Sequence, residues 1–138
     1  MDKHAHLTIL FDTNFLLIPS RFGVDVFSEL DRLVSGTYRC AVTPAVLEEL
    51  GHVAGRQKRS RAGEHDLAIY LSGRCATIDE PLSPGEEVDD QIVRLSSREG
   101  YAAATTDADL RRRLREQGVP VFYLRQRTHL AVDGSLPD

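Results

Sequence analysis

The sequence lacks the residue patterns that mark several common classes of protein. Its 138 residues include only two cysteines, Cys40 and Cys75, which form neither a CxxC pair nor part of a His/Cys cluster with zinc spacing. We therefore expect both to be small buried side chains in a reducing compartment. No apolar run approaches the ~20 residues of a membrane span, and the start of the chain carries no apolar segment of a secretory signal. The sequence predicts a cytoplasmic protein without membrane contact.

Other absences narrow the chemistry that the chain can perform. It has no glycine-rich phosphate-binding loop and no Ser-His-Asp or Cys-His spacing of a nucleophilic enzyme. Its only lysines are Lys3 and Lys58, and neither lies in the late strand-end position that a receiver domain requires. The formal net charge of −4 argues against a broad nucleic-acid-binding surface. It does not exclude a local nucleic-acid-binding surface, because basic residues gather at 56–61 and 111–115. Such groups are more often simply solvated faces.

What is present is the composition and pattern of a globular α/β protein. Apolar residues make up 41% and charged residues 28% of the chain, which is ordinary for one soluble domain. Short apolar runs alternate with segments of helical spacing, a pattern that favours a parallel sheet covered on both faces. We predict a three-layer α/β/α sandwich with a central, mainly parallel sheet of four to five strands. The predicted strands are 7–11, 37–42, 74–78, 101–106 and 119–125, and the predicted helices are 25–34, 44–55, 66–72, 86–98 and 109–117.

Four other segments interrupt this pattern. Residues 12–22 and 79–87 are polar and contain proline, so we predict that they are breaks between elements. Residues 56–66 are basic and polar, and they form either a loop or the start of the next helix. Residues 126–138 are polar with Gly and Pro, which predicts a loosely ordered tail. The domain itself is therefore expected to span residues 1–125.

Carboxylates follow two of the predicted strands at the point where each strand ends. Asp12 comes directly after the strand 7–11, and Asp107 and Asp109 follow the strand 101–106. Ligands bind at the carboxyl ends of strands in such sheets, so these acids share one functional edge. An Asp at this position also caps the helix that follows, where its charge suits the helix dipole. Capping does not explain several acids at one edge, because neighbouring carboxylates repel unless a cation lies between them.

Helical geometry adds two more candidate acids. At ~100° per residue, Glu49 lies at the border of the apolar face of its helix, whereas Glu48 points away. The same geometry puts Asp89 beside the apolar stripe of a later helix and leaves Asp90 facing away. Asp90 is then a first-turn acid favoured by the helix dipole. We expect Glu49 and Asp89 to be the functional members of the two pairs.

The resulting acids form an all-oxygen donor set. Without His or Cys, they suit Mg²⁺ or Mn²⁺, which prefer oxygen ligands and keep several waters. Such an open site suits phosphodiester hydrolysis, in which the ion activates a water and stabilises charge on the leaving oxygen. Three polar neighbours either orient the ligands by hydrogen bonds or only form turns and caps. The predicted catalytic residues are Asp12, Glu49, Asp89, Asp107 and Asp109, all but Glu49 as metal ligands, and the orienting candidates are Asn14, Thr105 and Thr106.

Four motifs in this order resemble the PIN-domain nucleases. They are FDTN at the first strand, TPAVLEEL on the second helix, DDQIVRLS on a later helix and ATTDADLRRRL near the end, and they cover residues 7–125. The last motif and the residues after it look closest to the branch containing the PIN endonuclease of the eukaryotic small-subunit processome and its archaeal relatives; VapC-type toxins are also related. The acids of the family pattern fall on the five residues named above. In particular, the family's helix motif matches Asp89 followed by Ile92 and Val93.

This resemblance implies a metal-dependent endoribonuclease. It implies two settings: ribosomal RNA maturation, with a ribosomal RNA precursor and a ribosome-assembly partner, or a VapC-type toxin neutralised by an antitoxin. A homodimer is a further expectation. The alternative is a non-catalytic PIN-like module that binds RNA or protein, although such modules typically lose one or more acids and this set is complete. The basic residues expected to hold RNA phosphates, which position RNA without reading its sequence, are Lys58, Arg59, Arg111 and Arg112.

Overall fold

A mainly parallel sheet forms the centre of the computed structural model, which describes residues 7–56 and 62–137 of the chain. The strands are β1 (Leu7–Phe11), β2 (Tyr38–Val42), β3 (Ala76–Thr77), β4 (Tyr101–Ala104), β5 (Val121–Arg125) and β6 (His129–Asp133). They form one six-stranded sheet in the order β3-β2-β1-β4-β5-β6. Every pair is parallel except β5 with β6. The predicted parallel α/β fold is confirmed, with one strand more than predicted.

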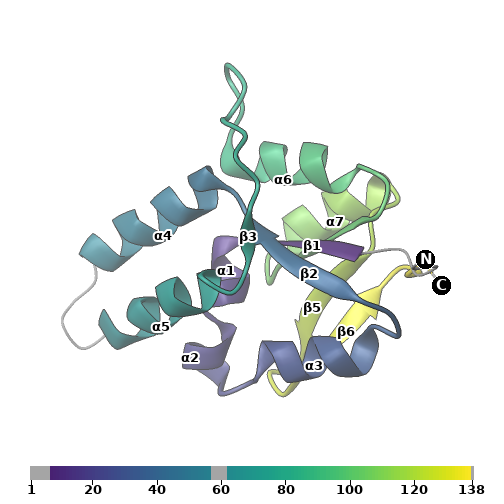
Figure 1. Cartoon of the computed structure of the whole chain (residues 1–138), viewed down its shortest axis with the longest axis horizontal. Coiled ribbons are helices and arrows are strands. Elements are labelled where there is room, and N and C mark those ends of the chain that lie inside the picture. Colours follow the sequence, from purple (N-terminus) through teal and green to yellow (C-terminus); the bar gives the residue numbers. More distant parts are fainter. Residues whose placement is uncertain (1–6, 57–61, 138) are drawn as a thin grey trace.

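Helices cover both faces of this sheet. They are α1 (Thr13–Leu16), α2 (Ile18–Phe22), α3 (Val26–Leu33), α4 (Pro44–Arg56), α5 (Ala62–Ser72), α6 (Val88–Ser96) and α7 (Ala108–Glu116). Figure 1 shows α6 and α7 on one side of the sheet and α2, α3 and α5 on the other. The predicted three-layer sandwich is therefore confirmed. All of β1 is buried at its centre, and Ala102, Ala103 and Ala104 of β4, the strand that α6 contacts, are buried as well.

Residues 12–22 were predicted to be a break, and this prediction is wrong. They form the short helices α1 and α2. Asp12 caps α1 by accepting a hydrogen bond from the Phe15 amide, and Gly23 ends α2 in the left-handed conformation at φ 68°. Each helix is too short to show the periodicity by which helices are found in a sequence. Residues 56–66 were predicted to form either a loop or the start of the next helix. Helix α5 begins at Ala62, so the last residues of this segment are helical.

The prediction of a loosely ordered tail from residue 126 is wrong as well. Strand β6 returns antiparallel to β5 through a tight turn in which the Thr128 amide donates to the Arg125 carbonyl at 3.2 Å. Gln126 and Arg127, at φ 55° and 63°, supply the two left-handed residues that such a hairpin turn requires. Left-handed turn positions usually hold Asn or Gly. Because this chain has Gln and Arg there, its sequence carries no recognisable hairpin signal.

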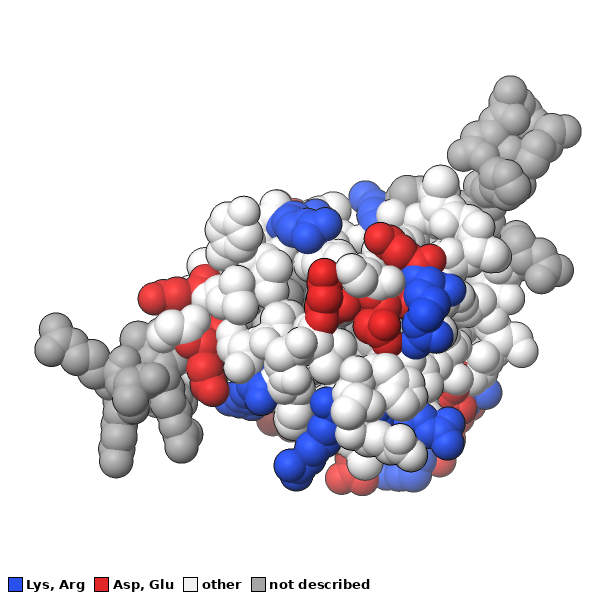
Figure 2. Space-filling view, turned by 90° about the horizontal axis from the view of Figure 1, so that it is seen from below, with Lys and Arg blue, Asp and Glu red and all other residues white. Residues whose placement is uncertain are grey.

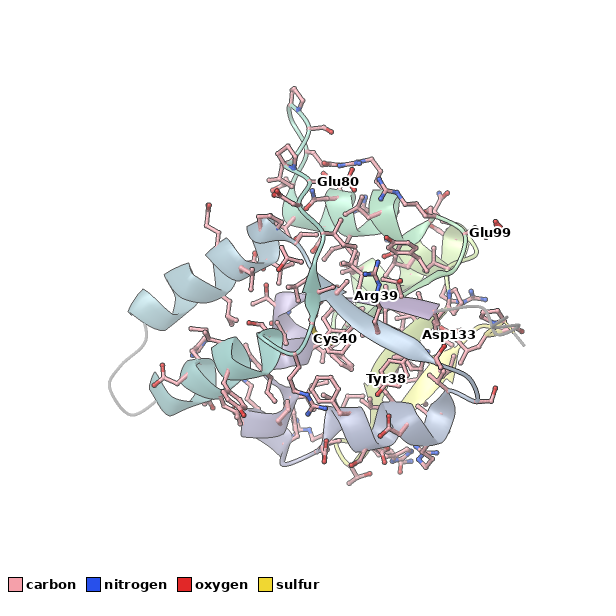
Figure 3. The ribbon with its side chains drawn as sticks, viewed as in Figure 1. Tyr38, Arg39, Cys40, Glu80, Glu99 and Asp133 are labelled. Carbon is pink, nitrogen blue, oxygen red and sulfur yellow. A yellow bond between two sulfur atoms is a disulfide. The ribbon has the colours of Figure 1, made fainter. Side chains whose placement is uncertain are left out.

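The prediction of two separate cysteines is wrong, because Cys40 and Cys75 form a disulfide with a Cα–Cα distance of 4.7 Å. The register explains the bond: Ala41 of β2 pairs with Ala76 of β3, and the cysteines immediately precede these partners. Figure 3 labels Cys40 on β2. Disulfides are rare in reducing compartments, so the cysteines no longer support a cytoplasmic location, which stays a prediction. Among the helices described, none has the length and apolar character needed to cross a membrane.

Candidate active site

The carboxyl ends of β1 and β4 bring Asp12 and Thr105 together. These strands are parallel neighbours in which Phe11 pairs with Ala104, so the next residue of each strand lies at the same level. The Asp12 amide donates to the Ala104 carbonyl at 3.1 Å, and the Thr105 hydroxyl donates to Oδ2 of Asp12. Thr105 is 1% exposed, so this hydroxyl is committed to orienting the carboxylate.

Asp12 is the most deeply buried acid of the predicted set. It is 5% exposed, and its Oδ1 accepts a hydrogen bond from the Phe15 amide at 2.7 Å. Burial raises the pKa of Asp12 to about 7, the two hydrogen bonds oppose this rise, and the carboxylates of Asp89 and Asp107 add to it. The hydrogen bonds therefore compensate only part of the lost hydration, and a bound cation would stabilise the ionised form.

Asp89 lies in the first turn of α6, and Asp107 is the N-cap residue of the neighbouring helix α7. Asp107 caps α7, because its Oδ1 accepts from the Leu110 amide at 3.0 Å, and its own amide donates to the Thr105 hydroxyl at 3.0 Å. Asp89 is exposed, but a partial loss of hydration raises its pKa. The charges of Asp107 and Glu49 raise this pKa further, and the charge of Arg113 opposes the rise. Since Asp107 acts on both Asp12 and Asp89, the three carboxylates share one electrostatic environment.

Asp90 differs from Asp89 in its bonding partners, although it was predicted to face away and in fact lines the same polar hollow as Asp89. Its Oδ1 accepts from Arg113 at 2.8 Å, and its Oδ2 accepts from the Glu87 amide at 2.9 Å, within a capping box at the start of α6. These bonds lower the pKa of Asp90. Both acids line this hollow, and the choice of Asp89 as the functional acid stays a prediction.

Glu49 reaches the same region from α4. The Thr13 hydroxyl, one residue after Asp12, donates to Oε1 of Glu49. A polar hollow of about 280 Å³ lies beside this contact. The residues that line it are Glu49, Glu87, Val88, Asp89, Asp90 and Arg113. Carboxylates from α4 and α6 therefore meet at one solvent-accessible depression.

Other predicted residues are not drawn into this group. The side chain of Asp109 is 90% exposed and lies 4.0 Å from Arg112. Asn14 and Thr106 are exposed. In this structure, neither makes the side-chain contacts to the acids that Thr105 and Thr13 make to Asp12 and Glu49.

The predicted RNA-binding residues fall into three situations. Lys58 and Arg59 lie outside the described residues. Arg111 bonds Asp133 at 2.9 Å and stacks on the Tyr123 ring at 3.5 Å, whereas Arg112 is 62% exposed and has Glu116 at 3.4 Å. On the face drawn in Figure 2, acidic side chains gather near the middle beside a basic group and the other basic side chains lie apart, so the described residues there form no continuous basic surface. Arg112 is the more accessible of the two arginines.

Sequence reasoning missed Thr13 and Arg113. Thr13 lies in the segment predicted as a break, where nothing assigned a direction to its side chain. Arg113 directly precedes the buried Leu114 of α7 and so flanks the apolar stripe of that helix. Helical periodicity around the buried residues Leu110 and Leu114 is therefore a sequence signal for Arg113.

The donor chemistry fits a water-rich Mg²⁺ or Mn²⁺ site. Within the described part of the chain, no three His, Cys, Asp or Glu side chains converge closely enough to enclose an ion. Mg²⁺ is usually held by only one or two carboxylates together with waters and substrate phosphates. The buried oxygen donor Asp12, with Asp89 and Asp107 nearby, matches this open arrangement.

Together, the parallel sheet and the acids at its carboxyl edge define an α/β domain with an acidic site at the ends of β1 and β4. A family model described as "PIN like domain" matches residues 9–127. The chain belongs to this family.

The chain is similar to curated proteins of two kinds. It is 31% identical over 124 residues to the rRNA-processing protein utp23 of Schizosaccharomyces pombe, a match that covers 86% of this chain and 45% of that protein. It is 23% identical to ribonuclease VapC4 of Methanocaldococcus jannaschii, covering 91% and 96% of the two chains. It is 25% identical to ribonuclease VapC9 of Archaeoglobus fulgidus, covering 88% and 86%. The chain thus spans less than half of utp23 but most of each VapC protein.

A solved structure supports the fold independently. The structure of the PIN domain endonuclease Utp24 matches with a TM-score of 0.75 at 21% identity, covering 94% of this chain and 92% of that one. At this identity the likeness concerns the fold, which agrees with the predicted PIN-like architecture.

Proposed function

We propose that this protein is a divalent-metal-dependent endoribonuclease. One observation carries the proposal: the buried carboxylate of Asp12 shares its environment with Asp89 and Asp107 at the carboxyl edge of the sheet. Membership of the PIN family and the similarity to proteins named ribonucleases support it. Like charges held together in this way are stabilised by a cation, and an all-oxygen set selects Mg²⁺ or Mn²⁺.

Each proposed residue has a distinct part in the site. Asp12, Asp89 and Asp107 would hold the ion, with Thr105 fixing the orientation of Asp12. Glu49, fixed by Thr13, and the exposed Asp109 complete the proposed catalytic set from the solvent side. A bound ion would supply an activated water and stabilise charge on the leaving oxygen.

RNA is the proposed substrate, and a ribosomal RNA precursor is the first candidate. The similarity to utp23, named as an rRNA-processing protein, favours this setting. The exposed Arg112 would contact phosphates beside the cleavage site, while Arg111 would need to exchange Asp133 for a phosphate. Lys58 and Arg59 are proposed to add a second backbone contact, and assembly partners or a second copy of the chain complete the proposed complex.

A VapC-type toxin is the second candidate. The observation in its favour is the similarity to two proteins named as VapC ribonucleases, VapC4 and VapC9. An antitoxin that blocks cleavage would decide for this setting. A non-catalytic module that binds RNA or protein is the remaining alternative.

Cleavage of a mixed RNA pool tests the proposal. The protein is incubated with Mn²⁺ or Mg²⁺, with EDTA, and as Asp12→Asn and Glu49→Gln variants. Glu48→Gln serves as the matched control, since Glu48 neighbours Glu49 on α4 but does not line the hollow. Cleavage that requires metal, Asp12 and Glu49, but not Glu48, supports the nuclease. Absence of cleavage, together with no rise in melting temperature on adding Mn²⁺, refutes it in favour of the binding module.

A further inference from the structure

Arg113 joins the two helices that carry acids of the proposed site. It projects from α7, which Asp107 caps, and its Nη2 donates to Oδ1 of Asp90 on α6 at 2.8 Å. Both side chains are partly exposed, at 40% and 41%. Arg113 also lines the polar hollow beside Glu49 and Asp89. A single ion pair therefore connects α6 and α7 at the rim of the site.

Asp90, the acidic partner in this ion pair, is also bonded to the residue at which α6 begins. The second carboxylate oxygen of Asp90 accepts from the Glu87 amide at 2.9 Å, while the Glu87 carbonyl accepts from the Gln91 amide at 3.1 Å. Asp89 thus lies between residues that are each bonded within the first turn. Whatever fixes Asp90 in space also fixes the backbone of Asp89.

The carboxylates themselves oppose this arrangement. Asp107 and Glu49 both act on Asp89 as like charges, so repulsion tends to move the first turn of α6 away from α7 and α4. Arg113 is attached to the same helix as Asp107 and pulls on the residue next to Asp89. Its attraction has the direction needed to counter that repulsion.

We propose that Arg113 is a positioning residue, which grips Asp90 and thereby holds Asp89 beside Asp107 for joint binding of a divalent cation. This inference rests on the proposed function of the site. Arg113 contacts Asp90 and, in this role, neither the ion nor the scissile phosphate; its charge also favours the ionised form of Asp89.

A second ion pair on α6 shows what a purely stabilising contact looks like. Arg94 bonds Glu86 at 2.8 Å through Nε and at 2.9 Å through Nη2, and the Arg94 side chain is also 40% exposed. It ties α6 to the preceding loop rather than to α7, and it does not line the hollow. Exposed ion pairs of either kind add little to stability. Arg94 is therefore a matched control for Arg113.

The test measures Mn²⁺ affinity by calorimetry on the full chain without RNA, comparing wild type, Arg113→Gln and Arg94→Gln. Simple electrostatics predicts tighter Mn²⁺ binding in Arg113→Gln, because a positive charge near the ion is removed. Positioning predicts the opposite: binding weakened by about tenfold, as for other groups that orient metal ligands. Arg113→Lys is expected to recover most of the affinity, and Arg94→Gln to leave it unchanged.

A second readout separates this inference from the metal site itself. Hydrogen exchange of the Asp90 and Gln91 amides, which are bonded to Glu87, is expected to accelerate in metal-free Arg113→Gln and not in Arg94→Gln. Unchanged or tighter Mn²⁺ binding by Arg113→Gln overturns the positioning role while leaving the proposed function intact. Failure of the wild-type protein to bind Mn²⁺ refutes the metal site, and the positioning role falls with it.

Discussion

Two groups of carboxylates in this protein have opposite surroundings. Two acids beside β6 have cationic partners: Glu29 of α3 bonds Arg32 at 2.9 Å, and Asp133 of β6 bonds Arg111 at 2.9 Å and Arg115 at 3.1 Å on α7 (Asp133 is labelled in Figure 3). At the ends of β1 and β4, the neighbours of Asp12 are two hydrogen-bond donors and two further carboxylates. We call these the paired seam and the acidic edge.

The difference shows up in the direction of the pKa shifts. The Arg32 guanidinium and the Leu130 amide lower the pKa of Glu29 in the paired seam, whereas burial raises the pKa of Asp12 at the acidic edge. In the seam, ionised acids stabilise the folded chain. At the edge, an ionised acid destabilises it unless a cation is supplied from outside. Strongly raised carboxylate pKa values cluster at functional sites. The raised pKa of Asp12 is therefore consistent with the proposed binding of a cation at the acidic edge.

Replacing Asp12 is expected to give the largest effect and to act on activity and stability in opposite directions. Asp12→Asn should reduce RNA cleavage by more than about 100-fold, since a proposed ligand matters more than the groups that orient it. At pH 8 without metal, the same variant should be more stable, by up to about 4 kcal/mol, because a pKa moved from 3.8 to about 7 carries ~1.4 kcal/mol per tenfold change in ionisation. Urea unfolding in EDTA measures the gain, and a loss of stability would contradict it.

Removing the disulfide is expected to change stability and leave metal binding unchanged. Because the bond carries no charge, it serves as a reference for the charged contacts of the paired seam and the acidic edge. It joins residues 35 positions apart, and closing a loop of that length in the unfolded chain is worth about 4 kcal/mol in the chain-entropy model. The Cys40→Ser/Cys75→Ser double variant should lose an amount of this order in urea unfolding and keep its Mn²⁺ affinity. Two reactive thiols in the untreated wild-type protein would contradict the bond itself.

The acidic edge was accessible from the sequence because it follows from local rules. Residues after parallel strands meet at one edge, which placed Asp12 and Asp107 together, and helical periodicity added Asp89. The structure puts these acids within electrostatic reach of one another. Their catalytic role, and that of Glu49 and Asp109, stays a prediction.

The paired seam was not accessible, because it depends on contacts between distant parts of the chain. Glu29 accepts from the Leu130 amide, 101 positions away, and this bond exists only once β6 has formed. Strand β6 in turn depends on left-handed backbone at Gln126 and Arg127, which the residue types do not signal. The disulfide was missed for the same reason, since it depends on the register between β2 and a two-residue strand.

Acidity should affect the two regions with opposite sign. The folded pKa of Asp12 is raised, so its contribution favours the metal-free folded state at low pH and is lost as the pH rises from 3.8 to about 7. The folded pKa of Glu29 is lowered, so its contribution is present above the ordinary value of 4.5 and is lost as the pH falls below it. Urea unfolding of wild type, Asp12→Asn and Glu29→Gln across pH 3–8 separates the two.

The same proton competes with the metal ion. Below pH 7, Mn²⁺ affinity should fall by up to about tenfold per pH unit, because Asp12 must lose its proton to bind the ion. Calorimetry at pH 6, 7 and 8 measures this slope. An affinity that does not change over this range would contradict Asp12 as a ligand.

Removing a charge from the paired seam should give the smallest effect. Asp133→Asn weakens the contacts to Arg111 and Arg115 and is expected to lower stability by about 1 kcal/mol, the upper end for partly exposed ion pairs. Its matched control is Glu116→Gln, which removes an exposed partner of Arg112 and should change stability by a few tenths of that amount. Neither variant should alter Mn²⁺ affinity, because neither acid belongs to the acidic edge. If Asp133→Asn weakens Mn²⁺ binding as Asp12→Asn does, the two regions are coupled and the distinction between a stabilising seam and a ligand-binding edge is wrong.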